Sequence, residues 1–287
     1  LHEVLTKEHP DYIGVAFDHG KTFRNDAYPQ YKAQREETPE DIKLSVPIIK
    51  DILKAYKIPI LQVDGYEADD VIGTVATKAG ADGIETYMLT PDYGQLMEPN
   101  VYMYRPRHGG GYDIIGEKEV EEKYGIQSPK QVIDLLALMG DSADNFPGCP
   151  GIGEKKAVKL INQFESVDNL LQHTDKLKGK MRENVEGAVD DIKMSYFLAT
   201  IKTDVPIGDL TLEKLKVEEP DEEKLNEIFT ELEFKSIKDK FLNKPTEKKK
   251  SVNRQLDLFS DFSNNGSEKS ENENFESLKT IAHNYKL

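Results

Sequence analysis

The stretch GYEADDVIG, residues 65–73, places three carboxylates within four residues: Glu67, Asp69 and Asp70. No basic residue follows them until Lys78, so a bound cation, rather than a neighbouring lysine, is expected to offset their mutual repulsion. Hard divalent cations such as Mg²⁺ prefer oxygen ligands. Two such ions about 3.5–4 Å apart can hold the attacking and leaving oxygens of a phosphodiester. The spacing therefore indicates a metal site suited to phosphodiester chemistry.

Further carboxylates stand where an alternating fold would bring them to the same place. Asp18 and Asp92 each follow a short apolar run, and Asp141 and Asp144 are three residues apart, which would put them on one side if that turn is helical. The alternative for the acidic cluster alone is that carboxylates begin a helix because they favour its N-terminus. We expect one metal site formed by Asp18, Glu67, Asp69, Asp70, Asp92, Asp141 and Asp144.

The elements that would carry these residues alternate between strands and helices. Apolar runs rich in strand-forming residues predict strands at 12–17, 58–63 and 86–90, with a fourth candidate at 101–104. Helix signals predict one helix behind Thr38-Pro39, bent at Pro47, and another from Glu67 to Gly80. This alternation predicts an α/β fold with a mostly parallel sheet, in which ligands bind beyond the carboxyl ends of the strands.

From Ser128 to about Phe241 the chain is predicted to be helical, and it contains the glycine-rich stretch GCPGIGEKKA. A turn of this kind ahead of a helix, here from about Glu154, can direct backbone N–H groups at a DNA phosphate. The alternative is a plain turn between two helices. The candidate DNA-binding residues are Gly148, Gly151, Ile152, Gly153, Lys155 and Lys156.

The stretch TFRNDAYPQYKAQR, residues 22–35, interleaves basic and aromatic side chains. The cations Arg24, Lys32 and Arg35 could bind phosphates, and the tyrosines among them could stack on bases. The alternative is a solvated helix face with two core tyrosines.

The composition bounds the function classes. A net charge of −15 argues against a general polyanion binder, although it is compatible with a carboxylate-lined metal site beside a local basic strip. No apolar run approaches the roughly 20 residues of a membrane span, and no signal peptide is recognisable. The single cysteine, Cys149, fits a reducing compartment, so a cytoplasmic protein is expected.

The chain changes character after Leu242. Residues 244–274 are rich in Lys, Ser, Asn and Glu and are predicted to be a flexible linker. Within it, an apolar segment resembles the short peptide by which bacterial replication proteins bind the sliding clamp; the alternative is a chance apolar island. The candidate clamp-binding residues are Gln255, Leu256, Leu258 and Phe259. Residues 275–287 look like the start of a following domain.

Five motifs together resemble the 5′ nuclease domain of bacterial DNA polymerase I, which is related to flap endonucleases. They are VAFDHGKTFRNDAYPQYKAQR, GYEADDVIG, LTPD…QL, LALMGDSADNFPGCPGIGEKKA and TIKTDVPI, in family order over about residues 12–240. The resemblance implies a PIN-like nuclease core with a helical arch in residues 1–127. It also implies a helical subdomain in residues 128–243 with a helix-hairpin-helix type element that grips duplex DNA.

The resemblance further implies structure-specific hydrolysis of 5′ flaps, nicked ends and RNA primers in bacterial, nucleoid-associated replication and repair. The seven carboxylates match ligands of two Mg²⁺ or Mn²⁺ ions, and the glycine-rich turn often holds K⁺ in this family. The chain would be covalently continuous with polymerase domains. The candidate catalytic residues are Asp18, Arg24, Lys32 and Arg35, of which the three cations would steer the scissile phosphate.

Two departures from the family pattern support a second hypothesis. Family members begin with a strand carrying an early aspartate, and this chain begins after it. The stretch LTPDYGQL is two residues shorter than usual, so Asp92 stands where the family has a pair. The alternative is therefore a catalytically incomplete fragment that binds branched DNA or tethers the polymerase to the clamp.

Overall fold

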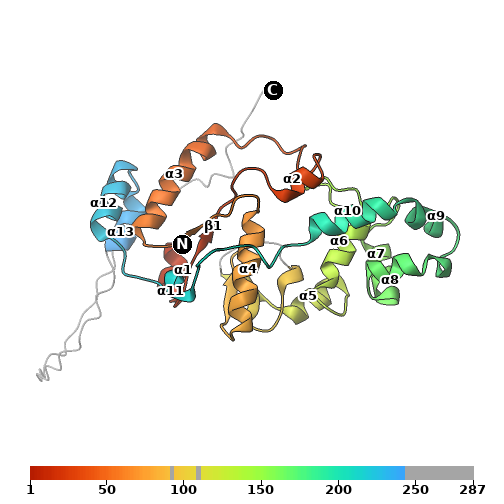
Figure 1. The fold of residues 1–287 in the computed structure, drawn as a ribbon. Coiled ribbons are helices and arrows are strands. Elements are labelled where there is room, and N and C mark those ends of the chain that lie inside the picture. The colour runs from red at the N-terminus through yellow and green to blue at the C-terminus, as the bar shows by residue number, and fades with distance from the viewer. Residues whose placement is uncertain (91–93, 108–110, 243–287) are drawn as a thin grey trace, which may run out of the picture. The chain divides into compact units, whose positions relative to one another are not determined.

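The strand-forming runs of the sequence build two small sheets. Strand β1 is labelled in Figure 1. Strand β1 (Val15–Ala16) pairs in parallel with β2 (Ile60–Leu61), and β3 (Thr86–Met88) pairs in parallel with β4 (Val101–Pro106). A further strand, β5 (Tyr112–Ile115), pairs antiparallel with β4 and was not predicted. Parallel pairing is thus confirmed for the four predicted strands, which form two separate sheets; β1, β2 and β3 are shorter than the predicted runs, whereas β4 is longer.

The computed structural model describes residues 1–90, 94–107 and 111–242. Within Leu1–Leu242 the contacts form one compact unit. The predicted metal ligand Asp92, the predicted linker and the four predicted clamp-binding residues, Gln255, Leu256, Leu258 and Phe259, lie outside the described residues. None of the helices in the described part is long and apolar enough to cross a membrane.

Helix α4 (Ala68–Ala81) joins the two sheets because it packs against β1, β3 and β4. Small residues permit this close packing. A Cβ atom added at Gly73 would lie 2.8 Å from Ile201 Cγ2, and one at Gly80 would lie 2.6 Å from Val101 Cγ2. The helix begins directly after Glu67, as predicted, so the acidic cluster is fixed at its N-terminus.

The basic stretch, residues 22–35, begins with helix α2 (Phe23–Ala27) and ends before helix α3 (Glu40–Ala55). Helix α3 continues through Pro47 and lies beside α12 (Glu222–Glu231), which packs on α13 (Lys235–Leu242) (Figure 1). The remaining short helices of this part are α1 (His2–Lys7) and α11 (Leu212–Leu215).

The second half of the described chain is helical, as predicted. Its helices are α5 (Glu117–Tyr124), α6 (Gln131–Met139), α7 (Glu154–Phe164), α8 (Val167–Gln172), α9 (Gly179–Gly187) and α10 (Val189–Ala199). Helix α6 packs against α7, α8 and α10. One buried apolar cluster extends from Val101 of β4 through Leu138 of α6 to Ile192 of α10. Both predicted subdomains therefore share a core, and their boundary near residue 127 stays a prediction.

Two 3₁₀ turns, Gly94–Leu96 and Thr174–Lys176, complete the described elements.

Candidate active site

Four of the predicted metal ligands line one open cavity of about 380 Å³: Glu67, Asp69, Asp141 and Asp144. Glu67 and Asp69 come from the start of α4, and the other two come from the loop that follows α6. Cations and a tyrosine of the basic stretch line the same cavity, namely Arg24, Tyr31 and Arg35. The structure thus brings together two carboxylate groups that are far apart in the sequence.

Asp70 lies apart from this cavity in a buried ion pair with Arg24. Both oxygens of Asp70 accept from the guanidinium, Oδ2 from Nη1 at 2.7 Å and Oδ1 from Nη2 at 2.8 Å. The same carboxylate accepts from the backbone N–H of Glu67 and of Lys202. Its side chain is 0% exposed and that of Arg24 is 2% exposed. The oxygens of Asp70 are therefore already satisfied by the protein.

Arg24 also ties α2 to the end of α10. Its Nε donates to the carbonyl of Leu198 at 2.9 Å, and Nη2 donates to that of Thr200 at 2.7 Å. Burial lowers the pKa of this guanidinium, but the charges of Asp70 and Glu67 outweigh burial and the net shift is upward. Arg24 is a charged structural clamp in this arrangement. Its donors are used inside the protein in this structure, and the expectation that Arg24 steers a substrate phosphate stays a prediction.

Glu67 is held by the basic stretch. One oxygen accepts from Lys32 Nζ at 2.7 Å, and the other accepts from the Tyr31 hydroxyl at 3.1 Å and from Arg24 Nη1 at 3.3 Å. Burial and the charges of Glu67 and Asp144 raise the pKa of the Tyr31 hydroxyl, so it remains a donor. Tyr31 is itself buried, which places it among the carboxylates rather than on a base-stacking surface.

Asp144 is held by the same stretch. It forms an ion pair with Arg35, accepts from the Tyr31 hydroxyl at 3.3 Å and lies 3.9 Å from Lys32 Nζ. The Lys32 side chain is 23% exposed and that of Arg35 is 53% exposed. These two long cations reach solvent, unlike Arg24.

The other two carboxylates with backbone contacts order their own surroundings. Asp141 accepts from the Ala143 N–H at 2.6 Å, and its backbone exchanges two hydrogen bonds with Phe146. Asp18 is exposed and accepts from the Ala68 N–H at 2.8 Å, so it caps the start of α4. Within the acidic cluster, the helix-capping alternative applies to Asp70 in addition to its ion pair, because Asp70 accepts from the Glu67 N–H; the contact of Asp18 at the same helix start was not predicted.

The donor chemistry of the cavity fits hard divalent cations, because its acidic lining consists of carboxylates. Within the described residues no three Asp, Glu, His or Cys side chains lie close enough to share one ion. Instead, Lys32 and Arg35 lie against Glu67 and Asp144. Both cations are partly exposed, whereas the pair of Asp70 and Arg24 is buried.

The glycine-rich turn is only partly available to an anion. Gly148 and Ile152 are buried, and their N–H groups donate inward, to Ser195 Oγ at 2.9 Å and to the Cys149 carbonyl at 3.1 Å. These two N–H groups are therefore used inside the protein, and contact of Gly148 and Ile152 with DNA stays a prediction. Gly151, Gly153, Lys155 and Lys156 are exposed. Gly153 precedes the first residue of α7, as predicted, and Lys156 Nζ donates to the Gly151 carbonyl at 2.6 Å.

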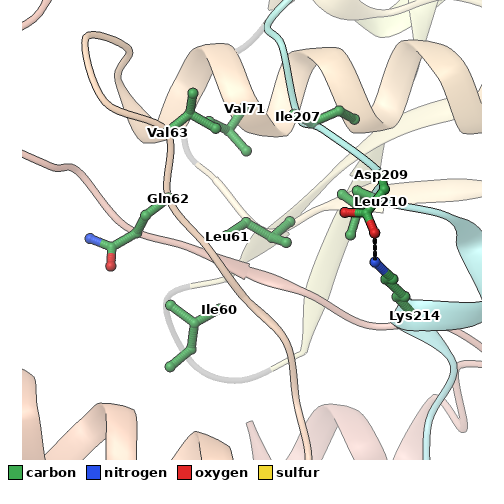
Figure 2. Close-up of a pocket in the computed structure, with 9 residues that line it drawn as sticks. All are labelled: Ile60, Leu61, Gln62, Val63, Val71, Ile207, Asp209, Leu210 and Lys214. Carbon is green, nitrogen blue, oxygen red and sulfur yellow. Dashed lines mark hydrogen bonds and ion pairs between the residues drawn. The ribbon is translucent and has the colours of Figure 1, made fainter.

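A second cavity, of about 200 Å³, lies beside β2 and the start of α4 (Figure 2). Figure 2 shows mainly aliphatic side chains around it, with the ion pair between Asp209 and Lys214 to one side. The predicted metal ligands do not line it. This cavity is therefore separate from the predicted site.

Two side chains near the carboxylates were not predicted to take part. Gln34 Nε2 donates to the Ser142 carbonyl at 2.7 Å, and Asn145 Nδ2 donates to the Gln30 carbonyl at 2.7 Å. Both lie inside motifs that the sequence analysis selected, but an amide gives no charge or metal-ligand signal. Only the structure shows that each reaches the other segment.

Comparisons with known proteins identify the family. The model of the 5′-3′ exonuclease N-terminal resolvase-like domain matches residues 1–125, and that of the 5′-3′ exonuclease C-terminal SAM fold matches residues 127–223. The 5′-3′ exonuclease of Aquifex aeolicus is 38% identical over 240 residues, which are 83% of this chain and 80% of that protein. DNA polymerase I of Bacillus caldotenax is 39% identical over 255 residues, which are 87% of this chain but 29% of that protein.

Solved structures support the fold. T5 5′-exonuclease with bound divalent metal ions (zinc) has a TM-score of 0.59 at 21% identity, covering 80% of this chain and 87% of that one. The catalytic core of Rad2 in complex with DNA substrate has a TM-score of 0.53 at 16% identity, covering 79% and 77%. These likenesses confirm the predicted nuclease-type α/β fold with its helical second part. Together with the two domain models in order and the Aquifex relative matched over most of its length, they show that the chain belongs to the 5′-3′ exonuclease family.

Proposed function

We propose that this chain is a metal-dependent, structure-specific 5′ nuclease. Its substrates would be the phosphodiester bonds of 5′ flaps, nicked ends and RNA primers in bacterial replication and repair, and it would act at the nucleoid as part of a DNA polymerase I. The observation that carries the proposal is the single cavity lined by Glu67, Asp69, Asp141 and Asp144 beside exposed cations.

Glu67, Asp69, Asp141 and Asp144 would hold two Mg²⁺ or Mn²⁺ ions. When bound, such ions supply a water of lowered pKa as nucleophile and stabilise the leaving 3′ oxygen. Asp92 and Asp18 are proposed as further ligands. Asp70 is better placed as the partner of Arg24, since its oxygens already accept four hydrogen bonds from Arg24, Glu67 and Lys202.

Lys32 and Arg35 are proposed to bind the scissile phosphate. Their side chains reach the cavity carboxylates and solvent at once, so they can turn to a phosphate placed between them. Charged donors directed at a phosphoryl group stabilise the charge that develops in the transition state, and a guanidinium matches the phosphate oxygens in a bidentate manner.

Duplex DNA is proposed to lie on the exposed part of the glycine-rich turn. Among the described residues no acceptor contacts the N–H groups of Gly151, Gly153 and Glu154, and these groups stand at the N-terminus of α7, where an anion is favoured. Lys155 is exposed beside them. A K⁺ ion at this turn, also proposed, would need carbonyls such as that of Gly151, which accepts from Lys156 Nζ here.

Cleavage of a labelled 5′-flap substrate in Mg²⁺ or Mn²⁺, with and without EDTA, tests the proposal. Asp141→Asn and Asp144→Asn are each expected to abolish cleavage while leaving DNA binding largely intact. Asp209→Asn is the matched control, because Asp209 is a highly exposed, ion-paired aspartate outside the main cavity. Unchanged cleavage in both cavity variants would refute the metal assignment. Salt-sensitive DNA binding without cleavage in the unmodified chain would favour the alternative of a binding protein.

The sliding clamp is proposed as a partner through Leu258 and Phe259, which lie outside the described residues. Apolar anchors in a polar linker suit a short docking peptide. Replacing both residues with Ala is expected to abolish capture by immobilised clamp, and undiminished capture would contradict the assignment.

A further inference from the structure

The segment that carries the exposed cations is docked on the loop that carries two of the carboxylates. We call residues 28–35 the connector base and residues 141–145 the carboxylate loop. The backbone N–H of Lys32 donates to the Asp144 carbonyl at 2.9 Å. At one side of this bond Gln34 Nε2 donates to the Ser142 carbonyl at 2.7 Å. At the other side Asn145 Nδ2 donates to the Gln30 carbonyl at 2.7 Å.

The two side-chain bonds are reciprocal. Each segment sends one primary amide to a backbone carbonyl of the other, although the segments are more than 100 residues apart in the sequence. Neither Gln34 nor Asn145 lines the cavity that contains the predicted metal ligands. They therefore fix the geometry of the two segments without contacting a molecule bound among the carboxylates.

The backbone in this contact is strained. Lys32 has φ +56° and Asn145 has φ +60°, both in the left-handed region. Asparagine visits this region readily, but a non-glycine residue such as Lys seldom does. Such conformations persist where the surrounding structure over-determines them, and they concentrate at functional sites. Here the strained Lys32 is also the residue whose Nζ lies 2.7 Å from Glu67.

We propose that Gln34 and Asn145 are positioning residues of the nuclease site. By clamping the connector base onto the carboxylate loop they hold Lys32 and Arg35 at a fixed distance from Glu67 and Asp144. The two cations would therefore contact the scissile phosphate at a fixed distance from the carboxylates that would hold the metal ions. This inference rests on the proposed function. Gln34 and Asn145 would act on the reaction through Lys32 and Arg35 and would not contact the substrate themselves.

The expected effect follows from geometry. A misplacement of about 1 Å in a catalytic group can reduce a rate by about 10²-fold. When either amide is lost, the connector base keeps the other amide bond and the bond from the Lys32 N–H to the Asp144 carbonyl. Each single variant, Asn145→Gly or Gln34→Ala, is therefore expected to lower kcat on a 5′-flap substrate by about 10-fold, and the double variant by about 100-fold. KM for DNA stays nearly unchanged, since neither side chain is at the proposed duplex-binding turn.

The variants are chosen to separate positioning from folding. Asn145→Gly removes the amide but accepts the positive φ, so the backbone turn is retained. Asn162→Ala is the matched control: Asn162 is an exposed asparagine whose Nδ2 donates to the Gly125 carbonyl at 2.8 Å, away from the carboxylates. It loses the same kind of bond, and its kcat is expected to equal that of the unmodified protein.

A second background tests whether the amides act through the cations. In a Lys32→Met, Arg35→Met protein the residual kcat is low, and adding Asn145→Gly is expected to lower it no further, because nothing remains to be positioned. A full 10-fold loss in that background would overturn the proposal, as would an unchanged kcat in both single variants.

Hydrogen exchange gives a readout that does not require activity. Exchange of the connector base, followed by mass spectrometry in metal-free protein, is expected to accelerate in Asn145→Gly and not in Asn162→Ala. Unaltered exchange would overturn the docking argument. Faster exchange in a chain whose unmodified form cleaves no substrate would instead contradict the proposed nuclease function, while leaving the docking contact established.

Discussion

Replacing Arg24 with Met tests the assignment that most changes the site. The guanidinium makes two bonds to Asp70 and two to backbone carbonyls, all between 2.7 and 2.9 Å, and it is 2% exposed. Methionine fills a similar volume but provides no charge and no donor. Asp70 would then be a buried, uncompensated carboxylate, because its side chain is 0% exposed.

The magnitude follows from that burial. Removing one partner of a buried ion pair costs about 3–5 kcal/mol. For a domain of this size 1 kcal/mol corresponds to roughly 2–4 °C in Tm, so Arg24→Met is expected to lower Tm by about 6–20 °C. Arg35→Met is the control. Its side chain is 53% exposed, and a surface ion pair contributes at most about 1 kcal/mol, so it should affect cleavage and leave Tm nearly unchanged.

A double-mutant cycle decides whether Asp70 is the cause. Thermal and urea denaturation would compare Arg24→Met, Asp70→Leu and the double variant. The double variant should be more stable than the sum of the two single losses predicts, since removing both charges leaves none unpaired. Strict additivity, or a loss below about 1 kcal/mol for Arg24→Met, would refute the structural role of the pair and return Arg24 to the phosphate-binding set.

The remaining predictions concern stability. Burial raises the pKa of Asp134 to about 6, so the folded state retains a proton that the unfolded state releases near pH 4. Stability should therefore fall as pH rises from about 4 to about 6. Asp134→Asn should flatten this dependence and be more stable than the unmodified protein at neutral pH; identical profiles would contradict the assignment. Gly148→Ala should lower the free energy of unfolding in urea by at least about 3 kcal/mol. Gly148 has φ +62°, and a Cβ atom there would lie 2.2 Å from the backbone N of Gly140. Gly153→Ala, with nothing within 4 Å of its Cβ, should cost less than about 1 kcal/mol, and equal losses would refute the steric argument.

Helix boundaries were predictable where local chemistry sets them. Gly140 follows the last residue of α6 with φ +71°, and Gly153 precedes the first residue of α7; both positions follow from glycine placement at helix ends. Strand β5 was not predicted because its apolar run is short and is interrupted by the charged Asp113. In the structure Asp113 forms an ion pair with Arg107 of the preceding segment. That pairing depends on register, which local composition does not reveal.

The site was predictable as a set of residues but not as a set of roles. Carboxylate spacing correctly indicated that Glu67 and Asp144 converge, because motifs at the ends of elements meet in an α/β fold. It could not distinguish Arg24 from Arg35. Both are arginines in one basic stretch, and the structure distinguishes them by burial. Their carboxylate partners lie far away in the sequence: Asp70 is 46 residues from Arg24, and Asp144 is 109 residues from Arg35.

Two of the crowded carboxylates of the EADD stretch have cationic partners in the protein, although a bound cation rather than a neighbouring lysine was expected to offset their repulsion. Arg24 satisfies Asp70, while Lys32 and Tyr31 satisfy Glu67. These partners lie 35 to 46 residues away in the sequence, which is why no neighbouring lysine was visible. Lys32 and Arg35 are the exposed members of this cation set. Under the proposed function they are therefore the side chains that could turn from the carboxylates to a phosphate when metal ions bind.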